Sequence, residues 1–192
     1  MGYNNSTVAR CSMVNSWYAK LLLALTFATL TALAAQIRIP LPFTPVPITM
    51  QTAIVLSAGL VLGPIWAFAS MAIYIVAGAL GAPVFSGGAS GVAALTGPTA
   101  GYLLGFIVAS LLTGFFRGST LRTATGTILG MLAIYIFGIG YLIVGMNMTV
   151  PAALSAGLYP FIVGAILKLV LVNSGDFAVR RIFRRDHKDK KE

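Results

Sequence analysis

Residues 123–144 read TATGTILGMLAIYIFGIGYLIV, an apolar run without one charged side chain. At 1.5 Å per residue, a helix of this length is roughly 33 Å long, enough to cross the hydrocarbon core of a bilayer, about 30 Å. A helix is also the form in which a single segment satisfies its own backbone hydrogen bonds in lipid. This stretch therefore predicts a membrane-spanning helix and indicates the fold class of the chain.

The composition of the whole chain agrees with this interpretation. Hydrophobic residues make up 58% of the 192 residues and charged residues 9%, against about 25% charged residues in soluble domains. Apolar runs recur, and we predict six spans at residues 19–37, 48–62, 65–80, 98–116, 123–144 and 160–183. The last span is placed at Pro160 because proline favours the first helical position. Residues 150–158 would then form a short interfacial helix.

The expected fold class is an all-α integral membrane protein, a bundle of six transmembrane helices in one domain, residues 19–183. A cytoplasmic N-terminal segment, residues 1–18, would precede it. A basic cytoplasmic tail, residues 184–192, would follow it.

The formal net charge of +9 would suggest a nucleic-acid partner in a soluble protein, but the positions of the charges indicate membrane orientation instead. Of the 13 lysines and arginines, all but Arg38 and Lys168 lie before or at the start of the first span, between the fourth and fifth, or at the end of the sixth and beyond it. Six alternating helices put these regions on one side, so the positive-inside rule predicts that both termini are cytoplasmic. We expect a protein of a bacterial cytoplasmic membrane whose tail contacts membrane lipids, with no nucleic-acid partner.

A cleaved signal peptide is an alternative for the first span, because Ala32-Leu33-Ala34 resembles a signal-peptidase site. Cleavage there would leave five spans and would separate the basic loop and the basic tail onto opposite faces. The single cysteine, Cys11, precedes the apolar run, which argues against a disulfide framework and a lipoprotein anchor.

Enzymatic chemistry lacks the residues it would need. The sole histidine, His187, lies in the charged tail, and the four acidic residues all fall near the C-terminus. Histidine-based metal ligation and acid–base catalysis within the membrane therefore have no side chains to use. A G-x-x-x-x-G-K-[ST] phosphate loop is also missing, so ATP-driven transport would need a motor on another chain.

Two uncharged loops lie on the outer side of this topology and predict a ligand pocket. Residues 40–51 contain four prolines together with Thr44 and Gln51, and residues 81–91 are rich in glycine around Phe85. Irregular apolar backbone at membrane depth is tolerated where it is packed in protein or lines a cavity. Neutral hydrogen-bonding groups beside an aromatic ring suit a ligand with an amide-like ring and an apolar body. The alternative is that these are ordinary turns, which glycine and proline also mark.

Lys168 is the residue that stands out most, because it lies inside the apolar run 161–172. A lysine at the centre of a membrane helix costs roughly 2.5–3.5 kcal/mol on insertion scales unless it lines a polar cavity or has a partner. The second, fourth and sixth spans all begin at the outer face, so their positive dipole ends would converge there with this charge. We predict an anionic ligand, a carboxylate above all. The alternative is that the side chain extends to the nearer membrane surface.

Aromatic and small residues add two further predictions. Tyr74 and Tyr102 flank the glycine loop and are candidate ligand contacts, although tyrosines near span ends also serve as interfacial anchors. Ala24, Ala28 and Ala32 stand four apart on the first span and form a smooth ridge that another helix could approach closely. That helix could belong to a partner subunit or to the same bundle.

Several short motifs together resemble a known family. They are Gln36-Ile37, Pro45-Val46-Pro47-Ile48-Thr49, Gln51, Gly63-Pro64, Pro83-Val84-Phe85, Gly87-Gly88, Gly97-Pro98-Thr99 and Gly101-Tyr102-Leu103. They resemble the BioY family of biotin-specific S components of energy-coupling-factor (ECF) transporters, over nearly the whole chain after residue 19. The resemblance implies a six-helix protein that holds a vitamin near the outer face, with a transmembrane T component and two ATPases as partners.

The resemblance also implies roles for individual residues. It places biotin contacts at Thr44, Gln51, Tyr74, Phe85, Gly87, Gly88, Tyr102 and Lys168, and T-component contacts at Ala24, Ala28 and Ala32. Lys168 would meet the carboxylate, the glycine loop and Thr44 would meet the ring, and the proline loop would close the pocket. The family pattern Gly-Asp-x-x-Lys reads Gly164-Ala165-Ile166-Leu167-Lys168 here, so the lysine is kept and the aspartate is absent.

We therefore expect a protein that binds biotin from the outside and supports its uptake, without a cofactor or enzymatic activity. Two alternatives stay open. One is an S component for another small anionic vitamin-like molecule, which the absent aspartate favours. The other is a membrane assembly subunit that binds no ligand.

Overall fold

The computed structural model describes residues 16–189, and the backbone there is predominantly helical. The elements are α1 (Trp17–Gln36), β1 (Arg38–Ile39), β2 (Ile48–Thr49), α2 (Gln51–Leu62), α3 (Pro64–Ala79), η3 (Ser86–Gly88), α4 (Gly91–Leu95), α5 (Ala100–Phe115), α6 (Thr120–Val144), α7 (Val150–Gly157), η4 (Tyr159–Phe161) and α8 (Ile162–Asp189). Cys11 and the rest of residues 1–15 lie outside the described residues, as do residues 190–192. The side chains from residue 183 onward, His187 among them, are also outside the description.

All six predicted spans correspond to helices. Three stretches of the described chain, Trp17–Gln36, Thr120–Val144 and Val150–Ile182, are long and apolar enough to cross a membrane. Gln51–Leu62, Pro64–Ala79 and Ala100–Phe115 are shorter apolar helices. The fold is that of an all-α integral membrane protein, as the composition predicts.

The structure differs from the sequence-based prediction at several helix ends. The second span begins at Gln51 rather than at residue 48, because Ile48 and Thr49 pair antiparallel with Ile39 and Arg38. This ladder closes the proline loop, residues 40–47, into a hairpin. The short helix α4 was not predicted, whereas α7 matches the predicted interfacial helix. The last helix continues past residue 183 to Asp189.

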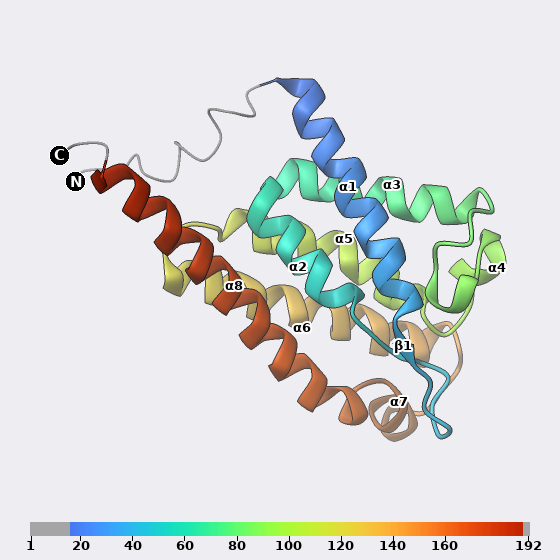
Figure 1. Ribbon diagram of the computed structural model, residues 1–192. Helices are drawn as coiled ribbons and strands as arrows, with labels where there is room; N and C mark the ends of the chain where they lie inside the picture. Colours follow the sequence, from blue (N-terminus) through green and yellow to red (C-terminus); the bar gives the residue numbers. More distant parts are fainter. Residues whose placement is uncertain (1–15, 190–192) are drawn as a thin grey trace.

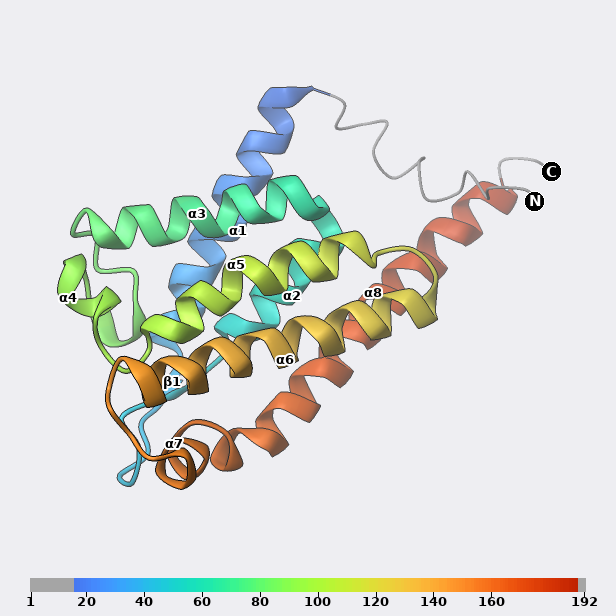
Figure 2. The ribbon, with the colours of Figure 1, turned by 180° about the vertical axis from the view of Figure 1, so that it is seen from behind.

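The helices pack in layers around a core that holds the site. In Figure 1, α1 lies across α2 and α3, while α5 and α6 run side by side behind them, as the reverse view in Figure 2 confirms. The long α8 passes diagonally along one side and packs against α2 and α6. The hairpin and α7 lie together at one end of the bundle, opposite the start of α1 and the end of α8 (Figure 1).

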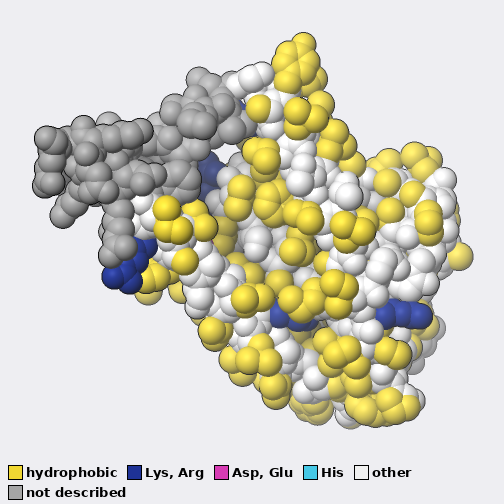
Figure 3. Space-filling view, viewed as in Figure 1, with side chains coloured by type: hydrophobic (Ala, Val, Ile, Leu, Met, Phe, Trp, Pro, Cys, Tyr) yellow, Lys and Arg dark blue, Asp and Glu magenta, His cyan; other side chains and the backbone are white. Residues whose placement is uncertain are grey.

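The surface of the molecule is apolar where a soluble protein would be polar. Hydrophobic side chains are spread over the described face in Figure 3, with few charged groups among them. Leu22, Ile136 and Leu167 are each more than 60% exposed. Soluble monomers rarely expose apolar patches of this extent, so these faces are suited to contact with lipid tails.

The interior is packed through small residues. At Gly101 on α5, a β-carbon would lie 2.3 Å from the backbone oxygen of Phe137 on α6, so the two helices approach as closely as glycine allows. Close approach through small residues is a main source of helix association in membranes, where lipid is as apolar as the side chains.

The predicted alanine ridge of α1 takes part in this internal packing. Ala24 is fully buried, Ala28 is 6% exposed, and Ala32 packs against the core. They belong to the face of α1 that meets α2 and α3. Ala24 and Ala28 are therefore covered within the bundle and Ala32 is partly exposed, and the contact of this ridge with a partner subunit stays a prediction.

Candidate functional site

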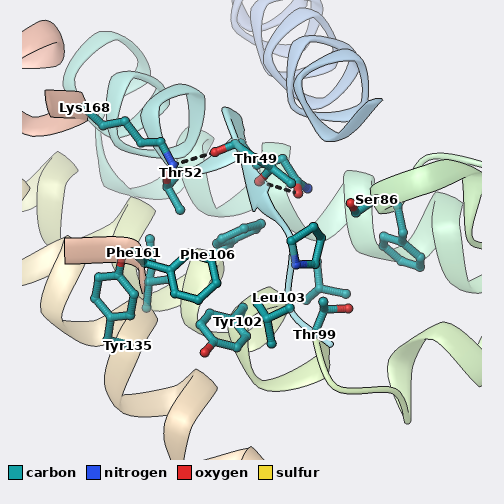
Figure 4. Close-up of a pocket in the computed structure, with 15 residues that line it drawn as sticks. Thr49, Thr52, Ser86, Thr99, Tyr102, Leu103, Phe106, Tyr135, Phe161 and Lys168 are labelled. Atoms are coloured by element: carbon teal, nitrogen blue, oxygen red, sulfur yellow. Dashed lines mark hydrogen bonds between the residues drawn. The ribbon is translucent and has the colours of Figure 1, made fainter. Parts of the chain in front are cut away.

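A cavity lies where the hairpin, the glycine loop and the beginnings of α2, α5 and α8 come together (Figure 4). The empty space within it and at its mouth, open solvent included, is about 580 Å³. Its lining residues are Val46, Pro47, Thr49, Gln51, Thr52, Phe85, Ser86, Thr99, Tyr102, Leu103, Phe106, Ile134, Tyr135, Phe161 and Lys168. Segments more than 100 residues apart in the chain therefore build one site.

Three helix N-termini meet at this cavity, as the alternating topology predicts. Gln51 and Thr52 open α2, Thr99 immediately precedes α5, and Phe161 immediately precedes α8. Each N-terminus carries a partial positive charge from the aligned peptide dipoles and from amides that have no partner within the helix. The walls are therefore electropositive before any side-chain charge is counted.

Lys168 adds a full positive charge to this region. Its side chain is half-buried and extends from α8 across to the hairpin, where Nζ donates a hydrogen bond to the backbone oxygen of Thr49 at 2.5 Å (Figure 4). The amine therefore points into the cavity and not to the membrane surface. Ala165, one turn earlier on α8, is 7% exposed. Among the described lining residues there is no carboxylate to offset the lysine charge.

Two hydroxyl groups in the cavity wall have no protein partner. Among the described residues, the Oγ1 of Thr52 and the Oγ of Ser86 are buried and make no hydrogen bond. Leaving a buried polar group unpaired costs about 1–3 kcal/mol, so such groups mark places where a ligand can gain hydrogen bonds. Lys168 and Thr52 lie at one side of the cavity and Ser86 at the other (Figure 4).

The remaining wall is aromatic and apolar. The rings of Tyr102, Phe106, Tyr135 and Phe161 gather on one side of the cavity (Figure 4). Tyr102 is held in place because its hydroxyl donates to the backbone oxygen of Gly157 at 2.9 Å. This wall can contact the apolar body of a ligand, while the opposite wall supplies polar groups.

Gln51 and Tyr74 belong to a buried hydrogen-bond network behind the cavity. Gln51 Nε2 donates to the hydroxyl of Tyr74 at 2.7 Å, and that hydroxyl donates to the backbone oxygen of Val84 at 3.2 Å. The Tyr74 ring, 1% exposed, meets Phe85 edge to face at 5.5 Å. Gln51 and Phe85 line the cavity and Tyr74 does not, so the structure places Tyr74 as a support for both.

Thr44 also stands behind the lining. Its hydroxyl donates to the backbone oxygen of Ala156 at the end of α7, at 2.6 Å, and accepts from the amide of Val46 at 3.1 Å. Val46 and Pro47, the next residues of the proline loop, do line the cavity. Thr44 therefore fastens the loop that covers the site to α7.

The glycine loop passes beside the cavity without its glycines lining it. Gly87 and Gly88 have φ values of 74° and 75°, a left-handed conformation that favours glycine. A β-carbon at Gly87 would lie 2.1 Å from a guanidinium nitrogen of Arg38. Arg38 is therefore packed over this loop, at the residue that follows Ser86.

Of the eight predicted ligand contacts, Gln51, Phe85, Tyr102 and Lys168 line the cavity, whereas Thr44, Tyr74, Gly87 and Gly88 lie behind or beside it. The prediction did not include several lining residues, namely Thr52, Ser86, Thr99, Phe106, Ile134, Tyr135 and Phe161. Ser86 and Thr99 stand in the loop and motif that the sequence marks. Phe106 and Ile134 carry no such signal, since they look like any other core residue of an apolar helix.

A cationic, partly aromatic cavity near one end of a helical membrane bundle is typical of a membrane transport protein that captures a small organic anion. The sequence profile of the BioY family matches residues 6–185. The chain belongs to the BioY family.

Relatives with curated names support this membership. A probable biotin transporter BioY of Pyrococcus horikoshii is 43% identical over 144 residues, which cover 74% of this chain and 84% of the relative. The biotin transporter BioY of Rhizobium etli is 35% identical over 164 residues, 78% of this chain and 86% of that one. The family and these relatives are transporters, so the prediction of a transport protein and not an enzyme is confirmed.

A solved structure has the same fold. The crystal structure of the S-component for biotin from an ECF-type ABC transporter superposes with a TM-score of 0.76 at 25% identity, covering 96% of this chain and 95% of that one. The predicted S-component-like bundle is therefore confirmed for the chain as a whole.

Proposed function

We propose that this chain captures biotin at the outer face of a bacterial cytoplasmic membrane and passes it inward. The observation that carries the proposal is Lys168, a cation directed into a cavity whose described lining residues include no carboxylate. A monoanionic ligand would supply the missing charge. Biotin is supported as that ligand because the relatives are named biotin transporters and the similar fold is that of an S-component for biotin.

The cavity is suited to an elongated molecule with an acid at one end and a polar ring at the other. Lys168 and Thr52 would receive the valerate carboxylate, beside the N-terminus of α2. Ser86, on the opposite side, would hydrogen-bond the ureido ring (Figure 4). Tyr102, Phe106 and Phe161 would contact the apolar atoms between these two ends.

The proline loop would act as the cover of this site. Pro47 lines the cavity, and Thr44 holds the loop against α7 through its hydrogen bond to Ala156. Biotin would enter when this loop leaves α7 and would be retained when it returns.

Inward delivery would use partner chains. The sequence contains no phosphate loop for ATP, so a transmembrane T component and two ATPases would supply the energy, as in ECF transporters. Both termini would be cytoplasmic, in agreement with the basic residues near them. Ala24 and Ala28 of α1 are buried and Ala32 is partly exposed, so a T component would reach the alanine ridge only at Ala32 while the bundle keeps this packing.

The test is thermal unfolding of the purified protein with a panel of ligands. Biotin should raise the melting temperature at micromolar concentration, while biotinamide, which lacks the negative charge, should act only at far higher concentration. Stabilisation by another vitamin and not by biotin would assign a different cargo. No stabilisation by any ligand of the panel would favour an assembly subunit.

A further inference from the structure

A ladder of polar side chains joins α6 and α8 below the cavity, outside the site described above. Asn173 Nδ2 donates to the hydroxyl of Thr127 at 2.9 Å, and Arg180 Nη2 donates to the hydroxyl of Thr123 at 2.9 Å. Thr127 is fully buried and Thr123 is 1% exposed. We call these four residues, Thr123, Thr127, Asn173 and Arg180, the α6–α8 ladder.

The two α8 members of the ladder are also fixed on their own helix. Asn173 Nδ2 donates a second hydrogen bond to the backbone oxygen of Leu169 at 2.8 Å. Arg180 forms an ion pair with Asp176, one turn earlier, and the two side chains are 16% and 10% exposed. The ladder is therefore a rigid connection, with its charges paired and its hydroxyls engaged.

Apolar packing alone would hold α8 in place only weakly. Ile162, Val163, Ile166 and Leu167 are exposed, and so are Val170 and Leu171 in the next turn. In lipid, turning such side chains inward gains little, because lipid tails are as apolar as the protein interior. Interhelical hydrogen bonds can instead specify the rotation of the helix about its axis.

The ladder and Lys168 lie at opposite edges of the buried face of α8. At 3.6 residues per turn, Asn173 stands about 140° around the helix from Lys168, with the buried Ala165 and Val172 between them. Lys168 reaches the hairpin ahead of α2, and Asn173 reaches α6. A rotation of α8 about its axis that broke the ladder would also rotate Lys168 about that axis and change where its amine points.

We propose that the α6–α8 ladder is a positioning device that sets the rotation of α8 and so directs residue 168 into the cavity. The ladder acts through Lys168 and does not touch the ligand. Its consequence for transport, that it sharpens selection for a carboxylate-bearing ligand, rests on the proposed function. The effect of the ladder on the direction of residue 168 is independent of the proposed function.

The direct test measures the accessibility of position 168. In a Cys11→Ala background, Lys168→Cys provides a single thiol, and its rate of modification by a small cationic methanethiosulfonate is measured in membranes. The thiolate is the reactive form, so a thiol turned toward lipid reacts more slowly than one facing a polar cavity. Thr123→Val with Thr127→Val removes both ladder hydroxyls and should slow labelling about threefold to tenfold.

Two variants control for general effects of these substitutions. Thr125 is also on α6 but is only partly buried, and its hydroxyl donates to the backbone oxygen of Leu121 within the same helix at 3.0 Å. Thr125→Val should leave the labelling rate unchanged. Thr127→Ser keeps the ladder hydroxyl, so its thiol at position 168 should be labelled at the same rate as in the Cys11→Ala, Lys168→Cys parent. The single Thr127→Val variant should be labelled more slowly. Equal rates in the double valine variant and its parent would overturn the proposal, as would an equal fall in Thr125→Val.

Biotin binding then connects the ladder to function. With Lys168 present, the double valine variant should weaken biotin binding about threefold to tenfold, and in a Lys168→Ala background the same two changes should add nothing. An equal loss in both backgrounds would mean a general structural role and would overturn the proposal. The double valine variant could label more slowly at position 168 while Lys168→Ala alone binds biotin as tightly as the parent. This result would uphold the positioning role of the ladder and reject the proposed contact between Lys168 and the carboxylate.

Discussion

Replacing Lys168 by methionine should weaken ligand binding strongly while leaving the stability of the ligand-free protein nearly unchanged. The substitution keeps an unbranched side chain of similar length and removes the charge and the hydrogen bond to the oxygen of Thr49. A buried cation within a span costs roughly 2.5–3.5 kcal/mol on insertion scales, and the lost hydrogen bond to a charged group is worth about 1.5–3 kcal/mol. These terms nearly cancel, so the ligand-free protein should be as stable as the parent or slightly more stable.

The loss of affinity should be much larger. Removing one partner of a desolvated charge pair costs about 2–5 kcal/mol, and about 2.7 kcal/mol already corresponds to a hundredfold weaker dissociation constant. At a biotin concentration 100 times the parent dissociation constant, binding stabilises the parent by about 2.7 kcal/mol. For a variant that binds a hundredfold more weakly, the same concentration contributes only about 0.4 kcal/mol.

The assay is thermal unfolding with and without biotin, together with equilibrium binding of labelled biotin. Leu167→Met is the matched control, because the neighbouring side chain is 65% exposed and the substitution introduces the same residue. Leu167→Met should leave both the melting temperature and the affinity for biotin near the parent values. A Lys168→Met variant that still binds biotin within threefold of the parent would refute the reasoning, since the cation would then contribute nothing to recognition.

Two further predictions concern the loops around the cavity. Thr44→Val removes the hydrogen bond to Ala156, about 0.5–1.5 kcal/mol, and should speed dissociation of labelled biotin about twofold to tenfold; an unchanged rate would mean that this bond does not hold the loop closed. Gly87→Ala should lower the melting temperature more than Gly88→Ala, since both have φ near 75° but only the first places a β-carbon 2.1 Å from Arg38. Arg38→Ala should remove the difference between the two variants, and equal losses with Arg38 present would contradict the contact.

Much of the fold followed from local sequence. The apolar run 123–144 predicts α6 (Thr120–Val144) within three residues at its start, because span length and backbone hydrogen bonding leave few alternatives in lipid. The start of α2 was predicted three residues too early. Ile48 and Thr49 continue the apolar run up to Leu62 but are also β-branched, which favours a strand, and their pairing with Ile39 and Arg38 depends on how the proline loop folds back.

The site was only partly predictable, because its contacts also depend on segments that are distant in the chain. Lys168 carries its own signal, because a charge in an apolar run needs an explanation wherever it occurs. Phe106 and Phe161 carry none, since an aromatic residue in a membrane helix looks the same whether it faces a cavity, a neighbouring helix or lipid. Thr44 was predicted as a ligand contact, yet its hydroxyl is engaged with Ala156, a residue more than 100 positions away.

The sequence by itself determined that the chain is helical, lies in a membrane and holds one costly charge deep in its last span. These properties depend on composition and on segment length, which act residue by residue along the chain. Only the tertiary structure decided that the alanine ridge of α1 faces inward, that Thr52 and Ser86 share a cavity with Lys168, and that α8 is joined to α6 by hydrogen bonds. Those outcomes depend on the rotation and contact of whole helices, and in lipid that rotation is determined by a few polar pairs and close glycine contacts whose partners are distant in the chain.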